Sequence, residues 1–429
     1  MQADPRADLT EAFGCGGEIR VTAAPGRVNL IGEHVDYHGL PVLPMALRRR
    51  IRVAYRPRTD RQIRAVSAGY GRREFEWTPE LSPAPAGDWE NYARAAAQAV
   101  ARKWGAGVGV DAAVVSDLPP AAGLSSSSAL LVAFTLALLE ANRQRATFEE
   151  LMEILPEGEQ FVGTRGGGMD HAASLASKAG CASLIGFDPL SVRAIPMPDE
   201  WGFLVAHSLR TAEKSGPVRE AFNARRRAGT AALARLGYAS YREAVASEAD
   251  HEKRRTGRAD ARLMTPEGVI AGQKARPHVR AADSEADDRI LSSALERDAF
   301  LHVTGEALRV TAAVKAMEAG DAATFGRLLL ESHASLRDRL KVSCPELDSL
   351  VDAAMESGAL GARLTGAGFG GCAVVFAAKR DLPAVREGLM ARFYAKKAGG
   401  PTNDVGTPAR ATYLIDAEPG PGALYRENS

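Results

Sequence analysis

The sequence predicts a mixed α/β protein built from two domains. Its 429 residues are too many for one compact core. Short runs that alternate apolar with charged residues are typical of half-buried strands, and they are interleaved with alanine-rich segments typical of helices. A polar stretch with three prolines, residues 187–201, separates the two halves. We therefore expect an N-terminal domain at 1–195 and a C-terminal domain at 196–429.

The elements follow in chain order from these patterns. In the first half, the patterns predict strands at 50–57, 63–68, 109–118 and 181–187, and helices at 89–104, after the serines near 125, at 147–160 and at 169–178. In the second half, they predict strands at 202–208, 362–368, 372–378 and 411–416, and helices at 217–236, 285–317, 322–340, 346–358 and 382–398. The second half is therefore the more helical one.

Composition points to a small-molecule partner. The 54 basic and 53 acidic residues nearly cancel, which argues against nucleic acid or anionic lipid as a partner. The segment 251–289 is rich in Arg and Lys, and we expect a solvated surface excursion there, with a nucleic-acid patch as the alternative.

The expected location is the cytoplasm. Four cysteines without CxxC spacing fit a reducing compartment. The N-terminus has no secretory signal, and the most apolar run, 129–139, is far shorter than the roughly 20 residues that span a bilayer.

The stretch APGRVNLIGEHVDY at 24–37 gathers ionisable groups beside a glycine-punctuated apolar run. Its polar members are Arg27, Glu33, His34 and Asp36. Groups this close in sequence indicate a ligand between them, and a polyhydroxylated molecule suits them because carboxylates accept hydroxyl hydrogen bonds in fixed directions. A surface charge cluster is the alternative.

The stretch LPPAAGLSSSSAL at 118–130 ends a strand and opens an apolar helix. Free backbone N–H groups and the helix dipole converge at such a point and favour an anion such as a phosphate. Hydroxyl side chains there can also bind Mg²⁺. The alternative is that Ser125 or Ser126 only caps the helix.

Two further glycine-rich stretches carry candidate chemistry. In GTRGGGMDHAAS at 163–174, consecutive glycines allow close approach to a ligand, and Asp170 falls in the first turn of a helix, ready to accept a hydrogen bond from a hydroxyl. A purely helix-stabilising role is the alternative for Asp170. RLTGAGFGGCAVVF at 363–376 is either a tightly packed hairpin or a second wall of a phosphate pocket.

These stretches, in this order, resemble the motifs of the GHMP family of small-molecule kinases, and within it the galactokinases. The resemblance covers most of the chain, and it includes smaller matches at WENY (89–92), FNARRR (222–227), HVTGE (302–306) and SHASLRD (332–338). It implies an N-terminal lobe like ribosomal protein S5 domain 2, a ferredoxin-like C-terminal lobe, and an active site between them.

The resemblance also implies roles for individual residues. Sugar-binding positions would be Glu33, His34, Asp36, Gly167 and Phe222. ATP-binding positions would be Trp89, Tyr92, Gly123, Leu124, Ser125, Ser126, Ser127, Gly366 and Gly368. Arg27 and Asp170 would be catalytic: ATP would phosphorylate an anomeric hydroxyl, with Asp170 as a base or an orienting group and Arg27 stabilising charge on the γ-phosphoryl group.

Magnesium is the implied metal. Ser127 would be one ligand, and a glutamate one helical turn before the aspartate loop would be the second. Glu159 is the expected residue and Glu157 the fallback, because Gly158 occupies the position that aligns with the family's glutamate.

Some positions depart from ordinary galactokinases. Val35 and His38 replace a threonine and an asparagine, Phe222 replaces a sugar-contacting tyrosine, and Ala121 and Ala122 replace glycines. The expected sugar is galactose, with N-acetylgalactosamine, galacturonate or arabinose as alternatives. A catalytically silent sensor of ATP and sugar is the alternative of another class, and the expected assembly is a monomer.

Overall fold

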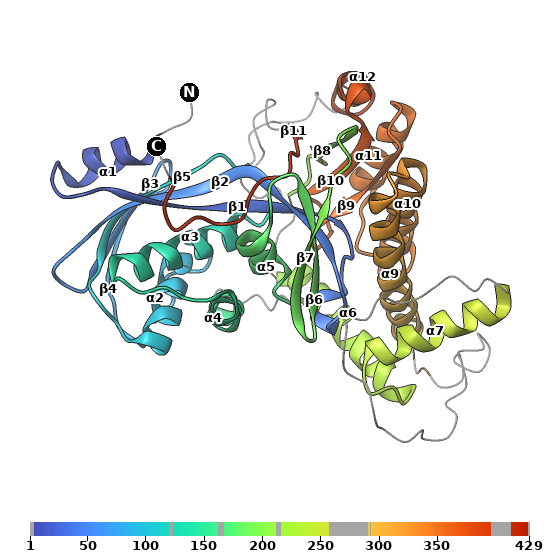
Figure 1. The fold of residues 1–429 in the computed structure, drawn as a ribbon, viewed down its shortest axis with the longest axis horizontal. Helices are drawn as coiled ribbons and strands as arrows, with labels where there is room; N and C mark the ends of the chain where they lie inside the picture. Colours follow the sequence, from blue (N-terminus) through green and yellow to red (C-terminus); the bar gives the residue numbers. More distant parts are fainter. Residues whose placement is uncertain are drawn as a thin grey trace.

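The computed structural model describes residues 4–119, 123–161, 167–211, 216–256, 291, 293–395 and 413–427. They form two lobes side by side (Figure 1). The N-terminal lobe has a five-stranded sheet in the order β1-β2-β5-β3-β4, and its strands are β1 (Arg20–Ile31), β2 (Leu43–Pro57), β3 (Gln62–Ser67), β4 (Gly71–Glu76) and β5 (Val110–Ser116). All neighbouring strands are antiparallel except β3 and β5.

Five helices and a hairpin complete this lobe within the described residues. They are α1 (Pro5–Phe13), α2 (Glu90–Trp104), α3 (Ser126–Ala141), α4 (Phe148–Phe161), α5 (Met169–Ala176) and the hairpin β6 (Cys181–Phe187) with β7 (Leu190–Pro196). Helix α3 is apolar on all sides, and every residue from Ser128 to Ala141 is buried. A helix of this composition is stable only inside a protein, and α3 lies at the centre of the largest apolar cluster.

The C-terminal lobe is built on a four-stranded antiparallel sheet in the order β11-β8-β10-β9. Its strands are β8 (Trp201–His207), β9 (Gly361–Thr365), β10 (Cys372–Ala378) and β11 (Leu414–Asp416). Its helices are α6 (Gly216–Arg235), α7 (Tyr241–Thr256), α9 (Ala294–Glu318), α10 (Ala322–Asp338), α11 (Pro345–Glu356) and α12 (Leu382–Leu389), which is followed by a π turn at Met390–Tyr394.

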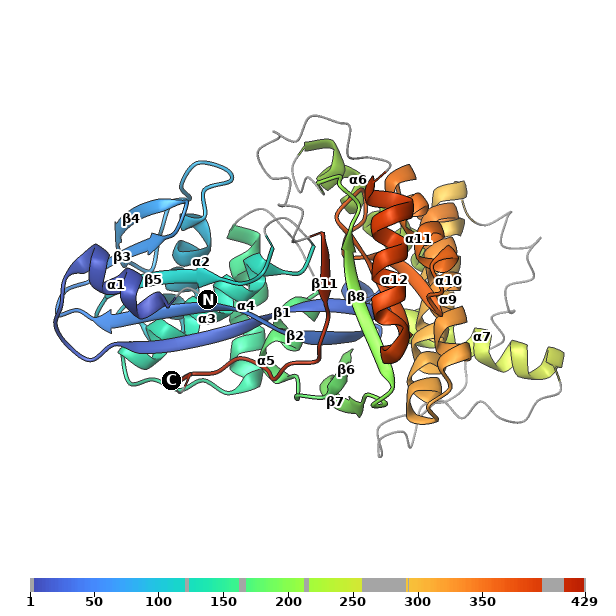
Figure 2. The same cartoon turned by 90° about the horizontal axis from the view of Figure 1, so that it is seen from above.

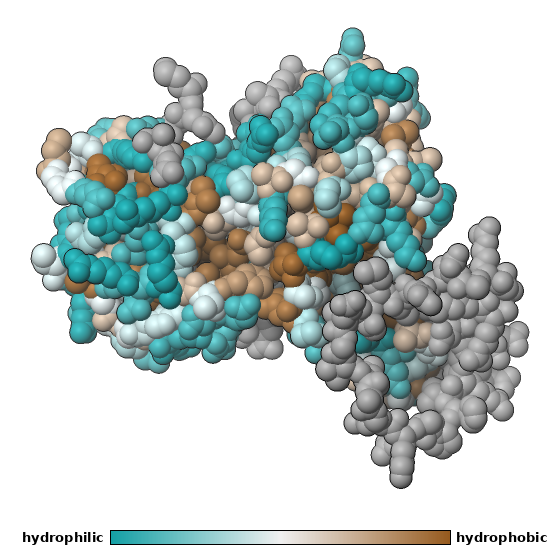
Figure 3. Space-filling view, in the orientation of Figure 1, coloured by the Kyte–Doolittle hydropathy of each residue, from teal (hydrophilic) through white to brown (hydrophobic). Residues whose placement is uncertain are grey.

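After β11 the chain leaves the C-terminal lobe and returns to the N-terminal one. Figure 2 shows this last segment running back along the N-terminal sheet. Its backbone pairs Leu424 with Ala23 of β1, and Gly420 N donates to Ala46 O of β2 at 2.8 Å. Residues 417–427 therefore connect the two lobes a second time. Figure 3 shows hydrophobic residues gathered in the hollow between the lobes.

Most predicted elements are confirmed. The mixed α/β class and the helices near 89–104, 147–160, 169–178, 217–236, 322–340 and 346–358 are present with ends shifted by a few residues. The prediction missed α1, β1, the first half of β2, β4, β7 and α7. The polar stretch at 187–201, which is the predicted domain boundary, contains β7, which pairs with β6. The division at residue 195 stays a prediction.

Some predictions fall outside the described residues. These are Ala121, Ala122 and the part of the basic segment from 257 to 289. None of the helices in the part of the chain that the structure describes is long and apolar enough to cross a membrane.

Candidate active site

Arg27 of β1 and Asp170 of α5 form a close ion pair in the N-terminal lobe. Asp170 Oδ1 accepts a hydrogen bond from Arg27 Nε at 2.7 Å and lies 2.6 Å from Arg27 Nη2. Arg27 Nη1 donates to the carbonyl of Gly123 at 2.8 Å. The guanidinium of Arg27 thus joins two loops that are far apart in sequence. We call them the serine loop (GLSSS, residues 123–127) and the GGGMD loop (residues 166–170).

Local backbone geometry brings these side chains together. Arg27 lies on β1 just after an irregularity in its pairing with β2, and Arg27 N donates to Leu124 O at 3.1 Å. A Cβ at Gly26 would lie 2.5 Å from a Leu118 methyl and 2.7 Å from Leu124 O, so only glycine permits this approach. Asp170 lies in the first turn of α5, which Gly168 opens with φ of 98°.

The serine loop has the geometry of an anion site. Ser125 has φ of 56° and ψ of 39°, and its side chain makes no capping hydrogen bond to α3. Its hydroxyl is buried and has no hydrogen-bond partner among the described residues. The first N–H groups of a helix lack partners within the helix. Ser125 therefore occupies the N-cap position of α3 without the side-chain hydrogen bond that capping requires, and its strained backbone favours a functional role. A capping role for Ser126 stays a prediction.

The turn after β9 forms a second wall of this site. A Cβ at Gly366 would lie 3.5 Å from Gly123 O, so the two glycine-containing turns touch. A Cβ at Gly368 would overlap the carbonyl of Val342, which requires glycine there. The turn is therefore not only a tightly packed hairpin, because it lies against the serine loop.

The residues of 33–37 lie around the GGGMD loop. Asp36 Oδ2 accepts a hydrogen bond from Gly167 N at 3.1 Å, and a Cβ at Gly167 would lie 2.5 Å from that oxygen. Phe222 of α6 packs on His34 and on Tyr37, with ring centroids 5.1 Å and 5.7 Å apart. The chain thus brings together four predicted sugar-binding residues, His34, Asp36, Gly167 and Phe222.

Burial and charge set the protonation of this cluster. Burial opposes the charge of Arg27, but the carboxylates of Asp170 and Glu33 outweigh it and raise the pKa of Arg27. Burial, with Asp170 nearby, raises the pKa of Asp36 to about 6. Burial lowers the pKa of His34 to about 3, so His34 is neutral at pH 7. The neutral His34 ring bonds to Tyr37 Oη at 2.8 Å through Nδ1.

Glu33, one of the sugar-binding candidates, is in contact with the C-terminal lobe. It is buried, and its Oε1 accepts a hydrogen bond from Gly366 N at 2.6 Å. The guanidinium of the fully buried Arg363 lies 3.4 Å from the same oxygen. Through Oε1, Glu33 therefore attaches the 33–37 segment to the C-terminal lobe.

The two aromatic residues predicted at the adenine site lie at the start of α2. Trp89 is buried, and its Nε1 has no hydrogen-bond partner in the described part of the chain. Tyr92 packs, partly buried, against the large apolar cluster. An unsatisfied buried N–H is costly unless a ligand or water accepts it, so Trp89 is suited to a ligand with acceptor atoms.

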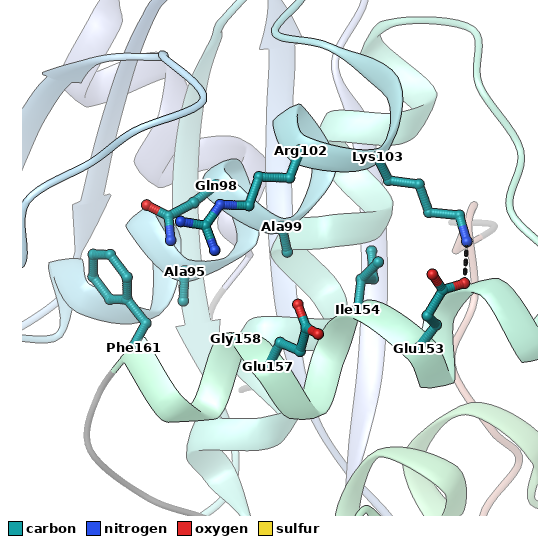
Figure 4. Close-up of a pocket in the computed structure, with 10 residues that line it drawn as sticks. All are labelled: Ala95, Gln98, Ala99, Arg102, Lys103, Glu153, Ile154, Glu157, Gly158 and Phe161. Carbon is teal, nitrogen blue, oxygen red and sulfur yellow. Dashed lines mark hydrogen bonds and ion pairs between the residues drawn. The ribbon is translucent and has the colours of Figure 1, made fainter.

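The predicted magnesium ligands are only partly brought together. Ser127 lies in the first turn of α3, next to Ser128, whose hydroxyl is 3.5 Å from Asp170 Oδ2. Glu157, the fallback ligand, instead lines a hollow of about 170 Å³ between α2 and α4 that contains none of these serines (Figure 4). A Cβ at Gly158 would point to α3, 3.2 Å from a Leu131 methyl. The side chain of Glu159 is outside the described set.

No group of three or more acidic, histidine or cysteine side chains in the described ranges could hold a metal by itself. Hydroxyl and carboxylate oxygens are nevertheless the donors that Mg²⁺ prefers, and nucleotide-bound Mg²⁺ usually has few protein ligands. The hydroxyl of Ser127, in the first turn of α3, is a donor of this kind and fits a magnesium ion that is bound together with ATP phosphates.

Sequence reasoning assigned no role to three residues that the structure joins to the site. Arg363 contacts Glu33, His302 Nε2 is 3.0 Å from Glu33 O, and Glu306 Oε1 accepts from Gly32 N at 2.9 Å. His302 and Glu306 lie in the HVTGE segment, and Arg363 begins the RLTGAG segment. The polar residues inside these apolar segments were the available signal.

Comparison with known proteins places this geometry in a family. The GHMP kinases N terminal domain model matches residues 91–178, the GHMP kinases C terminal model matches 313–396, and the galactokinase galactose-binding signature matches 8–57. The mevalonate kinase of Methanococcus jannaschii, 16% identical, has the same fold with a TM-score of 0.55 over 88% of this chain and 96% of that one. The protein is thus a kinase of the GHMP class.

More specific relatives define the family within this class. A galactokinase of Roseiflexus sp. is 35% identical, with 87% of each chain covered, and the human galactokinase is 34% identical over 93% of this chain and 95% of its own. The structure of Lactococcus lactis galactokinase complexed with galactose matches with a TM-score of 0.80 and 25% identity over 98% of both chains. This chain belongs to the galactokinase family.

Proposed function

We propose that this protein transfers the γ-phosphoryl group of ATP to the anomeric hydroxyl of galactose. The observation that carries the proposal is the contact of Arg27 with both Asp170 and the carbonyl of Gly123. It joins a carboxylate that can accept a hydroxyl proton, a cation, and a loop suited to phosphates. Family membership and the galactose-binding signature support galactose as the sugar.

The proposed chemistry uses the residues of this contact directly. Asp170 accepts or orients the proton of the sugar's C1 hydroxyl, and the C1 oxygen attacks the γ-phosphorus. The bond between the γ-phosphorus and the oxygen that bridges it to the β-phosphate breaks, and ADP leaves. Arg27, at 2.6 Å from Asp170, keeps that carboxylate ionised and stabilises negative charge on the transferred group. The N–H groups that begin α3 hold the phosphates.

Two buried donors that have no hydrogen-bond partner among the described residues support ATP as the phosphoryl donor. The Ser125 hydroxyl suits a phosphate oxygen, and Trp89 Nε1 suits an acceptor atom at the nucleotide. Ser127 would hold Mg²⁺ with the phosphates, and Glu159 is proposed as its second carboxylate ligand. When bound, the ion neutralises phosphate charge.

His34, Asp36 and Glu33 are the proposed sugar-binding residues. Phe222, which covers His34 at 5.1 Å, supplies an apolar wall in place of a phenol hydroxyl. The intact serine loop and the Arg27–Asp170 pair favour catalysis over a silent sensor. The protein is proposed to act as a cytoplasmic monomer, and its four unpaired cysteines agree with a reducing compartment.

The test measures ADP release by the purified protein with ATP and Mg²⁺. The panel contains galactose, N-acetylgalactosamine, galacturonate, arabinose and glucose. We expect turnover with galactose above all, and none after chelation of Mg²⁺ by EDTA. Turnover with another sugar alone would transfer the assignment to that sugar. No turnover with any of them, by a protein that still binds ATP and galactose in calorimetry, would favour the sensor.

A further inference from the structure

The turn Gly32–His34, at the start of the proposed sugar-binding segment (residues 33–37), has a strained backbone. Gly32 has φ of 103° and His34 has φ of 62°. A Cβ at Gly32 would lie 2.9 Å from Val42 Cα and 3.0 Å from a Val310 methyl. A non-glycine residue such as His34 adopts positive φ only where its surroundings impose it. Contacts outside the turn must therefore hold it.

Glu306 of α9 provides one of these contacts. Its side chain is fully buried, and Oε1 accepts hydrogen bonds from Gly32 N at 2.9 Å and from Ser332 Oγ at 2.7 Å. Its other oxygen, Oε2, accepts from Arg309 Nε at 2.8 Å. Both carboxylate oxygens are thus occupied, and one of them satisfies a backbone N–H of the turn.

His302, one turn earlier on α9, provides the second contact. Its Nε2 is 3.0 Å from the carbonyl of Glu33, and its Nδ1 is 2.9 Å from Ser335 Oγ. Because a carbonyl can only accept, the proton lies on Nε2, and Nδ1 accepts from the Ser335 hydroxyl. Glu306 therefore accepts a hydrogen bond from Gly32 N, and His302 donates one to Glu33 O. Gly32 and Glu33 are the two residues before His34.

Both side chains keep these roles at neutral pH. Burial alone would raise the pKa of Glu306, but the charge of Arg309 and other cations lower it to about 2, so the carboxylate is ionised. Burial lowers the pKa of His302 to about 4, so the imidazole is neutral and retains one donor and one acceptor. Neither group touches the Arg27–Asp170 pair in any contact described above.

We propose that Glu306 and His302 are positioning residues, which hold the Gly32–His34 turn in its strained conformation and thereby set the affinity for the sugar. This inference rests on the proposed function, since it takes the 33–37 segment as the sugar-binding element. It assigns no contact with the sugar to either residue. ATP, held by another loop, should bind independently of them.

Glu306→Gln tests the acceptor role directly. A glutamine side chain has one accepting and one donating end, so it cannot accept from both Gly32 N and Arg309 Nε. We expect KM for galactose to rise about tenfold or more, with KM for ATP changed less than about threefold. Adding Arg309→Met removes the competing donor, so the glutamine oxygen can face Gly32, and KM for galactose should fall back toward the wild-type value.

His302→Leu should raise KM for galactose in the same selective way, and it keeps the test decisive if Glu306→Gln folds poorly. The matched control is Thr304→Val on the same helix, because its buried hydroxyl donates to Phe300 O at 3.0 Å and bonds to no other described residue. This control should leave both KM values unchanged.

The measurements also separate this inference from the proposed function. If wild-type protein phosphorylates galactose while the folded Glu306→Gln and His302→Leu variants keep its KM for galactose, the positioning role is wrong. Equal rises in both KM values, or no recovery with Arg309→Met, would likewise overturn it in favour of general destabilisation. If wild-type protein neither binds nor phosphorylates galactose, the proposed function itself fails.

Discussion

The guanidinium of Arg27 and the carboxylate of Asp170 meet at 2.6 Å, and the same guanidinium bonds to the serine loop through Gly123 O. The Asp170 side chain is about one fifth exposed, whereas that of Arg27 is almost completely buried. A buried cation therefore faces a carboxylate that a substrate can still reach. This arrangement favours a carboxylate that is ionised, oriented and ready to accept a hydroxyl proton.

Asp170→Asn should abolish most turnover while retaining sugar binding. The amide has nearly the same shape and can still accept from Arg27, but it cannot take a proton from a hydroxyl. We expect kcat to fall by a factor of roughly 10² to 10⁴, with the Kd for galactose from calorimetry within a few-fold of wild type.

The matched control for this variant is Asp111→Asn. Asp111 is also an arginine-paired carboxylate of the N-terminal lobe, with Arg64 Nε at 2.6 Å, but it lies on β5 at the end away from the serine loop. This control should keep kcat. A kcat for Asp170→Asn within tenfold of wild type would show that Asp170 is not the proton acceptor.

Gly167→Ala should impair the enzyme through a steric clash. The added Cβ would lie 2.5 Å from both Asp36 Oδ2 and Tyr37 N, and neither can move without shifting the sugar-binding segment. We expect KM for galactose to rise by tenfold or more and Tm to fall. Gly158→Ala is the control, because its nearest neighbour is a rotatable Leu131 methyl at 3.2 Å. Unchanged galactose kinetics in Gly167→Ala would contradict the close packing of the two segments.

Local sequence patterns singled out several residues that the structure brings together, among them Arg27, Asp36 and Asp170. The apolar run after GLSSSS predicted a buried helix. Arg27, Asp36 and Asp170 are polar residues close to glycines in the sequence, and this pattern made them candidates. These signals are local, because a need for glycine and the burial of a segment both show in the identities of a few neighbouring residues. The fold class and the order of most helices could be predicted for the same reason.

Long-range contacts had no such signal. Glu306 looks like one polar residue in an amphipathic helix, and its partner Gly32 N is 274 residues away. The pairing of Leu424 with Ala23 likewise depends on which edge of the sheet is left open after folding. The resemblance gave Glu157 as the fallback ligand from its position before the aspartate loop, but its position in the sequence does not show what its side chain faces: it lines the α2–α4 hollow, which contains none of the serines.

Asp36 should make the protein less stable as the pH rises. Its pKa is about 6 in the folded protein, against an ordinary value of 3.8, because it is buried near Asp170. Between about pH 4 and pH 6 the unfolded chain loses this proton while the folded protein retains it, so this contribution to the free energy of unfolding decreases as pH rises. Asp36→Asn should therefore raise Tm at pH 7 more than at pH 4.

The ionised form is nevertheless the one that the proposed sugar binding needs. The wild-type KM for galactose should increase as pH falls through about 6, because a protonated carboxyl loses acceptor capacity. In Asp36→Asn this dependence should disappear and KM should be high at every pH. A Tm difference between the two proteins that is constant from pH 4 to pH 7 would contradict the raised pKa.

The returning C-terminal segment should be essential for the stability of the N-terminal lobe. Its backbone donates from Ala423 N to Ser174 O at 2.7 Å and from Leu424 N to Ala23 O at 2.8 Å. Ser174 lies on α5, the helix that carries Asp170, and Ala23 lies on β1, the strand that carries Arg27. The segment thus pairs with the outer edge of β1 and bonds to both elements that carry the proposed catalytic residues.

A chain that ends at Asp416 loses these bonds and exposes the edge of β1. At a net value of about 1 kcal/mol for each backbone hydrogen bond, the free energy of unfolding should fall by at least ~3 kcal/mol, and the exposed edge should promote aggregation. Urea unfolding and light scattering measure the two effects. The control ends at Glu427, which retains Glu427 N donating to Val21 O at 2.9 Å, and should match the full chain. Equal stability of both truncated chains would mean that β1 holds its edge without this segment.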